Sequence, residues 1–435
     1  METGGIVMKA YASMSREELL AEQEKLQAEY KGYEEAGLQL NMARGKPEPA
    51  QLDLAKDMLS IVDAETVCKS ESGDDCRNYG VMEGIIEARK LMAEIMEVKP
   101  EQVVVFGNAS LNIMYDTVAR SMLHGVNGST PWCKLDKVKF LCPVPGYDRH
   151  FAVTESFGIE MVNVPLLEDG PDMDLVEKLV SEDASIKGIW CIPKYSNPTG
   201  VSYSDETVRR FANLKPAAED FRIYWDNAYC VHHLYEEADK QDQILNILDE
   251  CEKAGNPDMA YMFASTSKIT FAGAGISAMA SSADNMAWVK KTMTVQTIGH
   301  DKVNQLRHVK FLKDRAGVDA HMMKHAAILR PKFELVEKMF ETEIAPLGIG
   351  SWIAPRGGYF ISFESLEGCA KNIVAKAKAA GVVLTGAGAP FPYGKDPKDS
   401  VIRLAPSFPN LEELETATKI FICCVKLASI EKLLA

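Results

Sequence analysis

The sequence has no excess of basic residues and no long apolar run. Its 48 lysine and arginine residues are outnumbered by 62 aspartate and glutamate residues, which gives a net charge of −14. A general nucleic-acid binder presents a basic field, so this balance argues against nucleic acid as a partner. No apolar stretch is long enough to span a bilayer, and the first residues do not resemble a signal peptide. We therefore expect a cytoplasmic protein that binds no membrane.

Cysteine is present without the spacing that metal sites and redox pairs require. None of the ten cysteines forms a CxxC pair, and Cys423 and Cys424 are adjacent within the apolar run 420–425. The eight histidines also lack the spacing of metal ligands. We expect reduced thiols in the core, no disulfide framework and no metal.

Short β-rich runs alternate with helical stretches in the middle of the chain. The runs span residues 103–106, 138–141, 188–192, 221–225 and 259–263, and a helical pattern over 111–123 follows the first of them. Strands separated by helices predict an α/β fold with a mostly parallel, doubly wound sheet. Ligands bind such sheets beyond the carboxyl ends of the strands.

The two ends of the chain have a different pattern. Residues 15–35 predict an amphipathic surface helix, too short and too acidic for a helix-turn-helix module. After about Lys302 long helical stretches are followed by the strand-like runs 357–363 and 401–404. We expect a large domain over 61–305 and a smaller α+β domain over 306–435, which the N-terminal segment 1–60 joins.

Three reactive side chains follow strand-like runs. Lys268 follows the run 259–263, Asp226 closes the run 221–225, and Tyr229 comes three residues later. In pyridoxal phosphate (PLP) enzymes a lysine binds the cofactor aldehyde as a Schiff base and an acid pairs with the pyridine nitrogen. Singly, Lys268 has the alternative of a solvated loop lysine, and Asp226 that of a helix N-cap or a partner of Arg222. Their order together favours an enzyme.

A polar turn and a row of hydroxyls are suited to a phosphate. The turn Gly107-Asn108-Ala109-Ser110 lies between a strand-like run and a helical pattern. Backbone N–H groups at such a helix start bind anions, and the Ser110 hydroxyl can add a donor. Ser265 and Ser267 flank Lys268 and offer two more hydroxyls.

Two further residues are suited to a planar ring and to a carboxylate. Tyr147 follows Pro145-Gly146 and can stack on a planar cofactor, with an ordinary core or surface tyrosine as the alternative. Arg403 lies inside the run 401–404, where a guanidinium is poorly tolerated unless an anion meets it. The alternative for Arg403 is an exposed edge-strand residue.

Together these residues resemble the class I and II aminotransferases of the PLP-dependent fold-type-I superfamily. The shared motifs are Ser196-Asn-Pro-Thr-Gly200, Asp226-x-x-Tyr229, Ser265-x-Ser-Lys268 and Arg403, in the family's order and approximate spacing. The segments 107–116, 145–150 and 265–275 resemble the MocR-like subfamily, whose stand-alone members are associated with aspartate aminotransferase activity. The resemblance covers about residues 41–407. It implies a mostly parallel seven-stranded sheet in an αβα sandwich, plus the smaller α+β domain.

The resemblance also implies a role for each residue toward the cofactor. Lys268 is the Schiff-base lysine and proton shuttle, and Asp226 pairs with the pyridinium nitrogen. Tyr229 and Asn197 bond the phenolic oxygen, while Tyr147 stacks on the ring. The implied phosphate ligands are Asn108, Ala109, Ser110, Ser265, Ser267 and Tyr79, the last from the neighbouring subunit. The active sites would therefore be shared across a homodimer.

The resemblance also implies which residues bind the substrate, and this chain differs from many members of the family at one phosphate-binding position. Arg403 is implied to bind the α-carboxylate, with Gly45 and Asn197 beside it. Many relatives have a phosphate-binding arginine eight residues after the lysine, where this chain has Ile276. The residue that binds a second carboxylate stays open among Arg44, Lys46, His300, Lys302 and Arg356.

The leading functional prediction is a PLP-dependent aminotransferase. It would move the amino group of a dicarboxylic amino acid, aspartate, to 2-oxoglutarate by a ping-pong mechanism. The alternatives are an aminotransferase or lyase acting on another amino acid, and a PLP-sensing regulatory module. The last would need a DNA-binding segment, and the residues before Asn41 contain no basic recognition helix.

Overall fold

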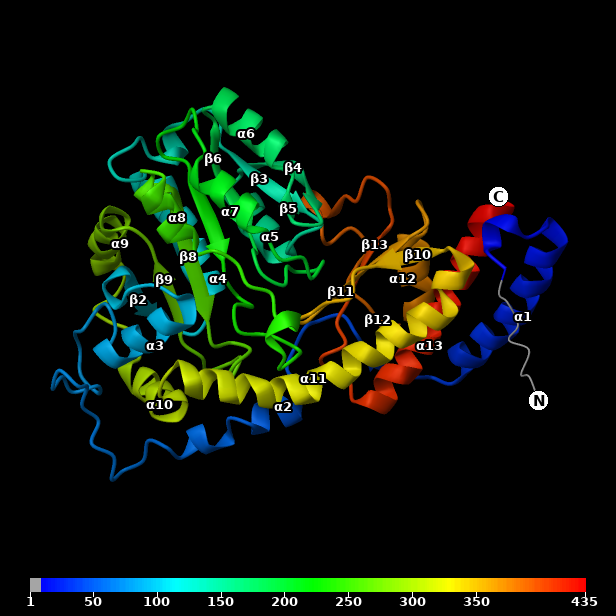
Figure 1. The fold of residues 1–435 in the computed structure, drawn as a ribbon, viewed down its shortest axis with the longest axis horizontal. Helices are drawn as coiled ribbons and strands as arrows, with labels where there is room; N and C mark the ends of the chain where they lie inside the picture. The colour runs from blue at the N-terminus through cyan, green and yellow to red at the C-terminus, as the bar shows by residue number, and fades with distance from the viewer. Residues whose placement is uncertain (1–8) are drawn as a thin grey trace.

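The computed structural model describes residues 9–435 (Figure 1). Residues 1–8 lie outside the described part, and they include the chain start that we expect not to be a signal peptide. An eight-stranded sheet forms the centre of the larger lobe, in the order β2-β9-β8-β7-β6-β3-β4-β5. Its strands are β2 (Val103–Phe106), β3 (Lys139–Val144), β4 (Glu160–Leu167), β5 (Gly170–Pro171), β6 (Ile186–Cys191), β7 (Arg222–Asp226), β8 (Ala260–Ser265) and β9 (Ser277–Ala280).

The predicted α/β fold with a mostly parallel sheet is confirmed. Strands β4, β3, β6, β7 and β8 pair in parallel, whereas β9 runs antiparallel to both β8 and β2. Seven strands were expected, and the eighth is the two-residue β5, antiparallel at the edge. The sequence pattern did not indicate β4, which contains Pro165, or β9, which is built from small residues of low β-propensity.

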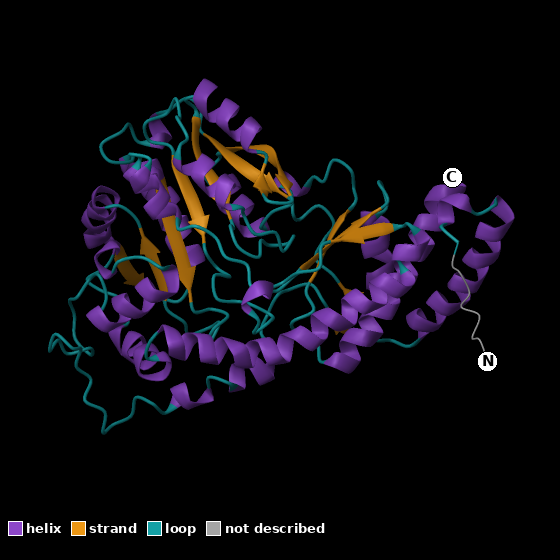
Figure 2. Ribbon diagram, viewed as in Figure 1, coloured by secondary structure: helices purple, strands orange, loops and turns teal. Residues whose placement is uncertain are grey.

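Helices cover both faces of this sheet, because side chains along each strand alternate between two buried layers. On β7, Ile223 and Trp225 pack into one apolar cluster and Tyr224 packs into the other. The first cluster is covered by α3 (Ile86–Met96), α6 (Met173–Glu182), α7 (Asp205–Ala212), α8 (Ile247–Lys253) and α10 (Lys302–Leu312). The second is covered by α4 (Ser110–His124), α5 (Asp148–Ser156) and α9 (Ala283–Gln296). The αβα sandwich is visible in Figure 2.

A smaller lobe has its own sheets and its own apolar cluster. It contains the antiparallel sheet β10-β11-β13 and the parallel pair β1-β12, in which Leu40 is opposite Val382. The strands are β1 (Leu40–Asn41), β10 (Gly350–Trp352), β11 (Ile361–Ser365), β12 (Val382–Val383) and β13 (Val401–Leu404). The remaining helices are α1 (Arg16–Glu35), α2 (Pro49–Asp53), α11 (Arg315–Glu343), α12 (Ala370–Ala379) and α13 (Leu411–Leu434). Figure 1 shows α11 running from below the large sheet to the smaller lobe.

The N-terminal helix forms where the sequence predicts it. Ser15 caps α1 through a capping box with Glu18, and the helix packs along α13. Between residues 9 and 35 the chain contains only a 3-10 turn and this one helix, so this part forms no winged-helix module. Over residues 9–435, none of the helices combines the length and the apolar character needed to cross a bilayer.

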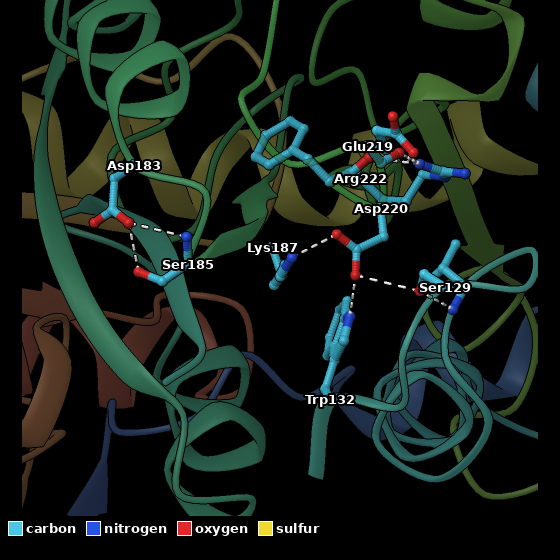
Figure 3. A network of polar contacts seen from close by, with 10 residues as sticks. Ser129, Trp132, Asp183, Ser185, Lys187, Glu219, Asp220 and Arg222 are labelled. Carbon is cyan, nitrogen blue, oxygen red and sulfur yellow. Dashed lines mark hydrogen bonds and ion pairs between the residues drawn. The ribbon is translucent and has the colours of Figure 1, made fainter. Parts of the chain in front are cut away.

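A buried polar network joins the amino ends of two central strands (Figure 3). Lys187 at the start of β6 donates to Asp220 Oδ1 at 2.6 Å, just before β7. The second oxygen of Asp220 accepts from Trp132 Nε1 at 2.8 Å and from Ser129 Oγ at 3.3 Å. These groups are satisfied by one another, and they lie at the end of β7 opposite Asp226.

Candidate active site

The carboxyl ends of β7 and β8 bring the predicted reactive residues together. Asp226 is the last residue of β7, and the turn after β8 carries Lys268. The two strands are paired with Asp226 opposite Phe263. Lys268 Nζ lies 5.0 Å from the centre of the Tyr229 ring. Lys268, Asp226 and Tyr229 therefore share one edge of the sheet.

Asp226 is buried with one oxygen bound and the other free of protein partners. Its Oδ2 lies 2.9 Å from His150 Nε2, while the buried Oδ1 has no hydrogen-bond partner. His150 is held by stacking on Trp190, with ring centres 4.4 Å apart. Arg222 bonds the carbonyls of residues 219 and 221, so the alternative ion pair with Asp226 is wrong. An unpaired buried carboxylate oxygen requires a donor, and a protonated pyridine nitrogen supplies one.

The role of His150 was not predicted, although it lies in a segment on which the resemblance rests. Its signal in the sequence is only its place at the end of Pro145-Gly-Tyr-Asp-Arg-His150. His150 contacts Asp226 because α5 packs at the end of β7, although the two residues are 76 positions apart in the chain. Periodicity in one segment cannot report such a contact.

Tyr229 and Asn197 line the same cavity as Lys268. Both side chains are buried. Burial, together with the charge of Asp226, raises the pKa of Tyr229 well above its usual value, so its hydroxyl stays protonated and can donate. Burial also raises the pKa of Tyr147 to about 12, and the Tyr147 ring lies edge-on to His150 at 5.0 Å.

The start of α4 presents uncapped backbone N–H groups. Its N-cap is Ala109, which makes no side-chain cap and is a poor residue for that position. Ser110 begins the helix, and across the site the Ser265 hydroxyl lies 3.0 Å from that of Ser267. The free N–H groups and three hydroxyls fit a phosphate.

Asn108 has a structural connection that the sequence did not reveal. Its Oδ1 accepts from Gly275 N at 2.6 Å and its Nδ2 donates to Ala272 O at 3.2 Å. The Asn108 side chain thus connects the turn 107–110 to the loop after Lys268. Ile276, at the position where relatives place an arginine, is buried in the apolar cluster beneath the sheet.

A cavity of about 530 Å³ opens between the two lobes in front of Lys268. Its lining includes Tyr147, Asn197, Tyr229 and Lys268 from the larger lobe, with Gly45, Phe360, Thr385 and Arg403 from the smaller one. Gly45 has to lack a side chain, because a Cβ there would lie 2.5 Å from Phe360 Cζ. The Phe360 ring in turn lies 5.0 Å below the Arg403 guanidinium.

Arg403 is buried and directed at the cavity, which rules out the alternative of an exposed edge residue. It is only 6% exposed although β13 is at the edge of its sheet. Its Nη1 donates to Asp148 Oδ1 at 2.7 Å and to Asn197 Oδ1 at 3.3 Å, while its buried Nε has no partner. A guanidinium so placed can bind a carboxylate.

Two of the five residues considered for a second carboxylate line this cavity. Arg44 and Lys46 are exposed at its rim, and so is Arg149, which was not predicted. Arg356 lies in a different pocket and pairs with Asp242 at 3.3 Å. His300 and Lys302 are not among the cavity's lining residues.

Tyr79 lies away from this chain's own cavity. It is 83% exposed, in the loop before α3, and its ring has no role in the core. The neighbouring Gly80 carbonyl accepts from Lys302 Nζ at 2.9 Å, which fixes the loop at its base.

Known proteins resemble this chain over most of its length. The model of the family described as aspartate amino-transferase matches residues 14–435. The chain is 47% identical to a provisionally named aminotransferase of Mycolicibacterium smegmatis, over 98% of this chain and 99% of that one. It is 45% identical to an aspartate aminotransferase of Corynebacterium glutamicum, over 91% of this chain and 90% of that one.

A solved structure extends the likeness to three dimensions. The crystal structure of an aspartate transaminase from Corynebacterium glutamicum superposes with a TM-score of 0.94 at 42% identity, covering 97% of this chain and 99% of that one. The narrower assignment to the MocR-like subfamily stays a prediction. The chain belongs to the aspartate aminotransferase family and is a pyridoxal-phosphate-dependent aminotransferase of fold type I.

Proposed function

We propose that this enzyme transfers the amino group of aspartate to 2-oxoglutarate by a ping-pong mechanism. The observation that carries the proposal is one cavity that contains both Lys268 and Arg403, with the cations Arg44 and Lys46 at its rim. A dicarboxylic substrate needs two cationic contacts and an amine-accepting centre between them. The similarity to an aspartate aminotransferase of Corynebacterium glutamicum, and to an aspartate transaminase structure from that species, supports the same substrate.

Each residue near Lys268 has a proposed task. Bound pyridoxal phosphate supplies a reactive aldehyde and a ring that withdraws electrons from the substrate Cα. Asp226 keeps the ring nitrogen protonated through its free Oδ1, and His150 holds the other oxygen in place. Lys268 Nζ, which the cavity places beside the substrate, would accept and hold the proton removed from the substrate Cα.

The remaining proposed contacts are with the phenolic oxygen, the ring face and the phosphate of the cofactor. Tyr229, kept protonated by burial, donates to the phenolic oxygen, and Asn197 lies beside it. Tyr147 lines the cavity and would stack on the cofactor ring. The proposed phosphate ligands are Asn108, Ala109, Ser110, Ser265 and Ser267, with hydroxyl and backbone donors where relatives add an arginine.

Arg403 binds the α-carboxylate of the substrate, and the missing side chain of Gly45 leaves Phe360 free to support the guanidinium from below. The distal carboxylate meets Arg44 or Lys46. Arg149 adds a third cation at the same rim. This cluster gives the cavity a local field opposite to the protein's negative charge.

A homodimer with shared active sites is the proposed assembly. Tyr79 is exposed and would reach the phosphate of the partner's cofactor. Other exposed apolar side chains lie in the segment before Tyr79 and in the segment at the end of α9, namely Leu59, Val67, Val295 and Ile298. These segments meet, because a Cβ at Gly299 would lie 2.7 Å from Gly80 O. A Tyr79→Phe enzyme that is dimeric but binds the cofactor as tightly as the wild type would contradict this role.

We further propose a cytoplasmic location and a division into a large domain over 61–305 and a small one over 1–60 and 306–435. The apolar cluster beneath the large sheet extends into α11 as far as Met322. The cluster of the smaller lobe begins on α11 at Leu329. Helix α11 therefore contributes to both cores and connects the two domains, and the residues from Leu306 to Met322 pack on the large sheet although they lie beyond the proposed boundary.

A spectral titration tests the proposed reaction. The purified enzyme is mixed with each amino acid in turn, and conversion of the visible band of the bound cofactor to the band of its aminated form is followed. Aspartate and glutamate should convert it at the lowest concentrations, and Lys268→Ala should lack the starting band. Conversion by an aromatic or neutral amino acid alone would favour the alternative substrate classes, and protein that binds no cofactor would refute the proposal.

A further inference from the structure

Three buried histidines form side-chain hydrogen bonds to the turn that carries Lys268. They are His308 on α10 and His321 and His325 on α11, and none is more than 5% exposed. Figure 1 shows α11 passing below the point where β8 ends. No role in binding cofactor or substrate has been given to them, and they do not line the cavity. Buried imidazoles need partners, so their hydrogen bonds show what they hold.

Two of the three converge on a single carbonyl. His321 Nε2 lies 2.7 Å and His325 Nε2 lies 3.0 Å from the oxygen of Ile269, the residue directly after Lys268. A carbonyl only accepts hydrogen bonds, so an imidazole that bonds it carries a proton on Nε2, and the two Nε2 atoms, 3.1 Å apart, share this acceptor. The peptide between Ile269 and Thr270, one residue beyond the lysine, is thus held by two imidazoles from one helix.

The N-terminal segment determines the protonation state of His325. Gln51, wholly buried in α2, accepts from Glu48 N through its Oε1, which directs its Nε2 at His325 Nδ1 at 3.1 Å. Since that amide nitrogen donates, His325 Nδ1 must be unprotonated. A protonated His325 would place two N–H groups against each other.

The same amide leads back to the lysine. Gln51 Nε2 also donates to the Tyr359 hydroxyl at 2.9 Å. The Tyr359 ring lies 5.9 Å from Lys268 Nζ. The chain of contacts therefore begins at the peptide after Lys268 and ends on an aromatic ring next to its amine.

His308 holds the opposite side of the turn. Its Nδ1 donates to Asn304 O at 2.8 Å, so its Nε2 accepts, and the Thr270 hydroxyl lies 2.9 Å away. The Thr266 hydroxyl lies 3.2 Å from the same nitrogen. Thr266 and Thr270 are the two ends of the turn, and both are buried.

We propose that His308, His321 and His325, with Gln51 behind them, are positioning residues that fix the rotation of the Lys268 turn and so the direction of its amine. The proposal rests on the role of Lys268 given above. All three histidines act as neutral imidazoles. Consistent with this, burial lowers the pKa of His308 and of His325 to about 4 and also lowers that of His321.

Substitution at His321 and His325 tests the proposal. Leucine removes the donor to Ile269 O, whereas glutamine keeps an N–H group. In His321→Leu and His325→Leu we expect kcat to fall on the order of 100-fold, with a change in KM for aspartate of less than about threefold. We also expect the pH midpoint of the visible cofactor band to move by about one unit, since that midpoint reports the environment of the lysine nitrogen. His321→Gln and His325→Gln should stay near the wild type.

The controls separate positioning from stability. Val336→Ala, which truncates a buried residue farther along α11, should lower the thermal stability of the cofactor-free protein and leave the midpoint unchanged. Folded leucine variants with the wild-type midpoint and kcat would overturn the proposal, and so would an equal shift in Val336→Ala. If the leucine variants do not fold, Gln51→Met is measured in their place. An unchanged pH midpoint of the cofactor band in Gln51→Met would also overturn the proposal. A wild-type band that survives in Lys268→Ala would instead refute the role of Lys268 itself.

Discussion

Arg403 Nη1 and Asp148 Oδ1 lie 2.7 Å apart at the mouth of the cavity. The arginine is buried, whereas about a third of the Asp148 side chain is exposed, at 34%. The guanidinium that should bind the substrate's α-carboxylate is therefore already paired with a carboxylate of the protein. An incoming substrate has to share or displace that partner.

Replacing Asp148 by asparagine should strengthen carboxylate binding. The change removes the competing charge but keeps the shape and one acceptor. We expect the Kd of a dicarboxylate such as succinate to fall by about fivefold, which corresponds to about 1 kcal/mol. Calorimetry on the cofactor-loaded enzyme measures this. A weaker affinity would show that Asp148 orients Arg403 more than it competes with the substrate.

Asp226 should be essential for its charge and not only for its hydrogen bond. In Asp226→Asn the free oxygen or amide cannot keep the ring nitrogen protonated, so kcat should fall by about 10² to 10³-fold. His150→Phe keeps the stacking on Trp190 but removes the contact to Oδ2, and a smaller loss is expected. Steady-state kinetics compares the two. Equal losses in both variants would mean that His150 supplies the decisive proton.

The phosphate hydroxyls should contribute separately because no arginine stands at position 276. Ser265→Ala and Ser267→Ala each remove one donor, and each should raise the Kd of pyridoxal phosphate by roughly tenfold, about 1.4 kcal/mol. Fluorescence titration of the cofactor-free protein measures the affinity. Ile276→Arg should not compensate, since its side chain would enter the apolar core, and about 3 kcal/mol or more of stability should be lost.

The buried histidines predict a pH dependence of stability. His325 has an ordinary pKa of 6.5 when unfolded and about 4 when folded. Above pH 6.5 His325 is neutral in both the folded and the unfolded state, so its full contribution to the free energy of unfolding is present. As the pH falls from 6.5 toward 4 the unfolded state takes up the proton first, so the free energy of unfolding should decrease. Denaturant titrations across this range should show a shallower decrease in His325→Gln; an identical slope would contradict the assignment.

The ion pair between Lys187 and Asp220, at the amino ends of β6 and β7, should affect stability and not activity. Asp220→Ala leaves Lys187 as a buried, unpaired charge, and we expect the free energy of unfolding to fall by about 3 to 5 kcal/mol. Below its unfolding temperature the variant should keep the wild-type kcat, because Asp220 lies at the opposite end of β7 from Asp226. A reduced kcat in the folded variant would show that the sheet register affects the site.

Much of the site could be predicted because it follows strand ends. Asp226 and Lys268 come after apolar runs of strand length, and parallel strands bring their carboxyl ends to one edge. The same reasoning missed β9, since Ser277–Ala280 is a strand only because β2 and β8 pair with it on both sides. It also missed His150, whose partner Asp226 is 76 positions away, and Arg149, which reaches the rim of the cavity only through the packing of α5.

The sequence by itself determined the fold class and singled out Lys268 and Asp226 as the candidate lysine and acid, because these depend on local patterns of burial and on residue order. Only the tertiary structure decided which oxygen of Asp226 is free, that Asp148 already pairs with Arg403, and that histidines from α10 and α11 hold the Lys268 turn. Those contacts join segments separated by tens to hundreds of positions. Their geometry is set by how helices pack on the sheet, and no local pattern records that packing.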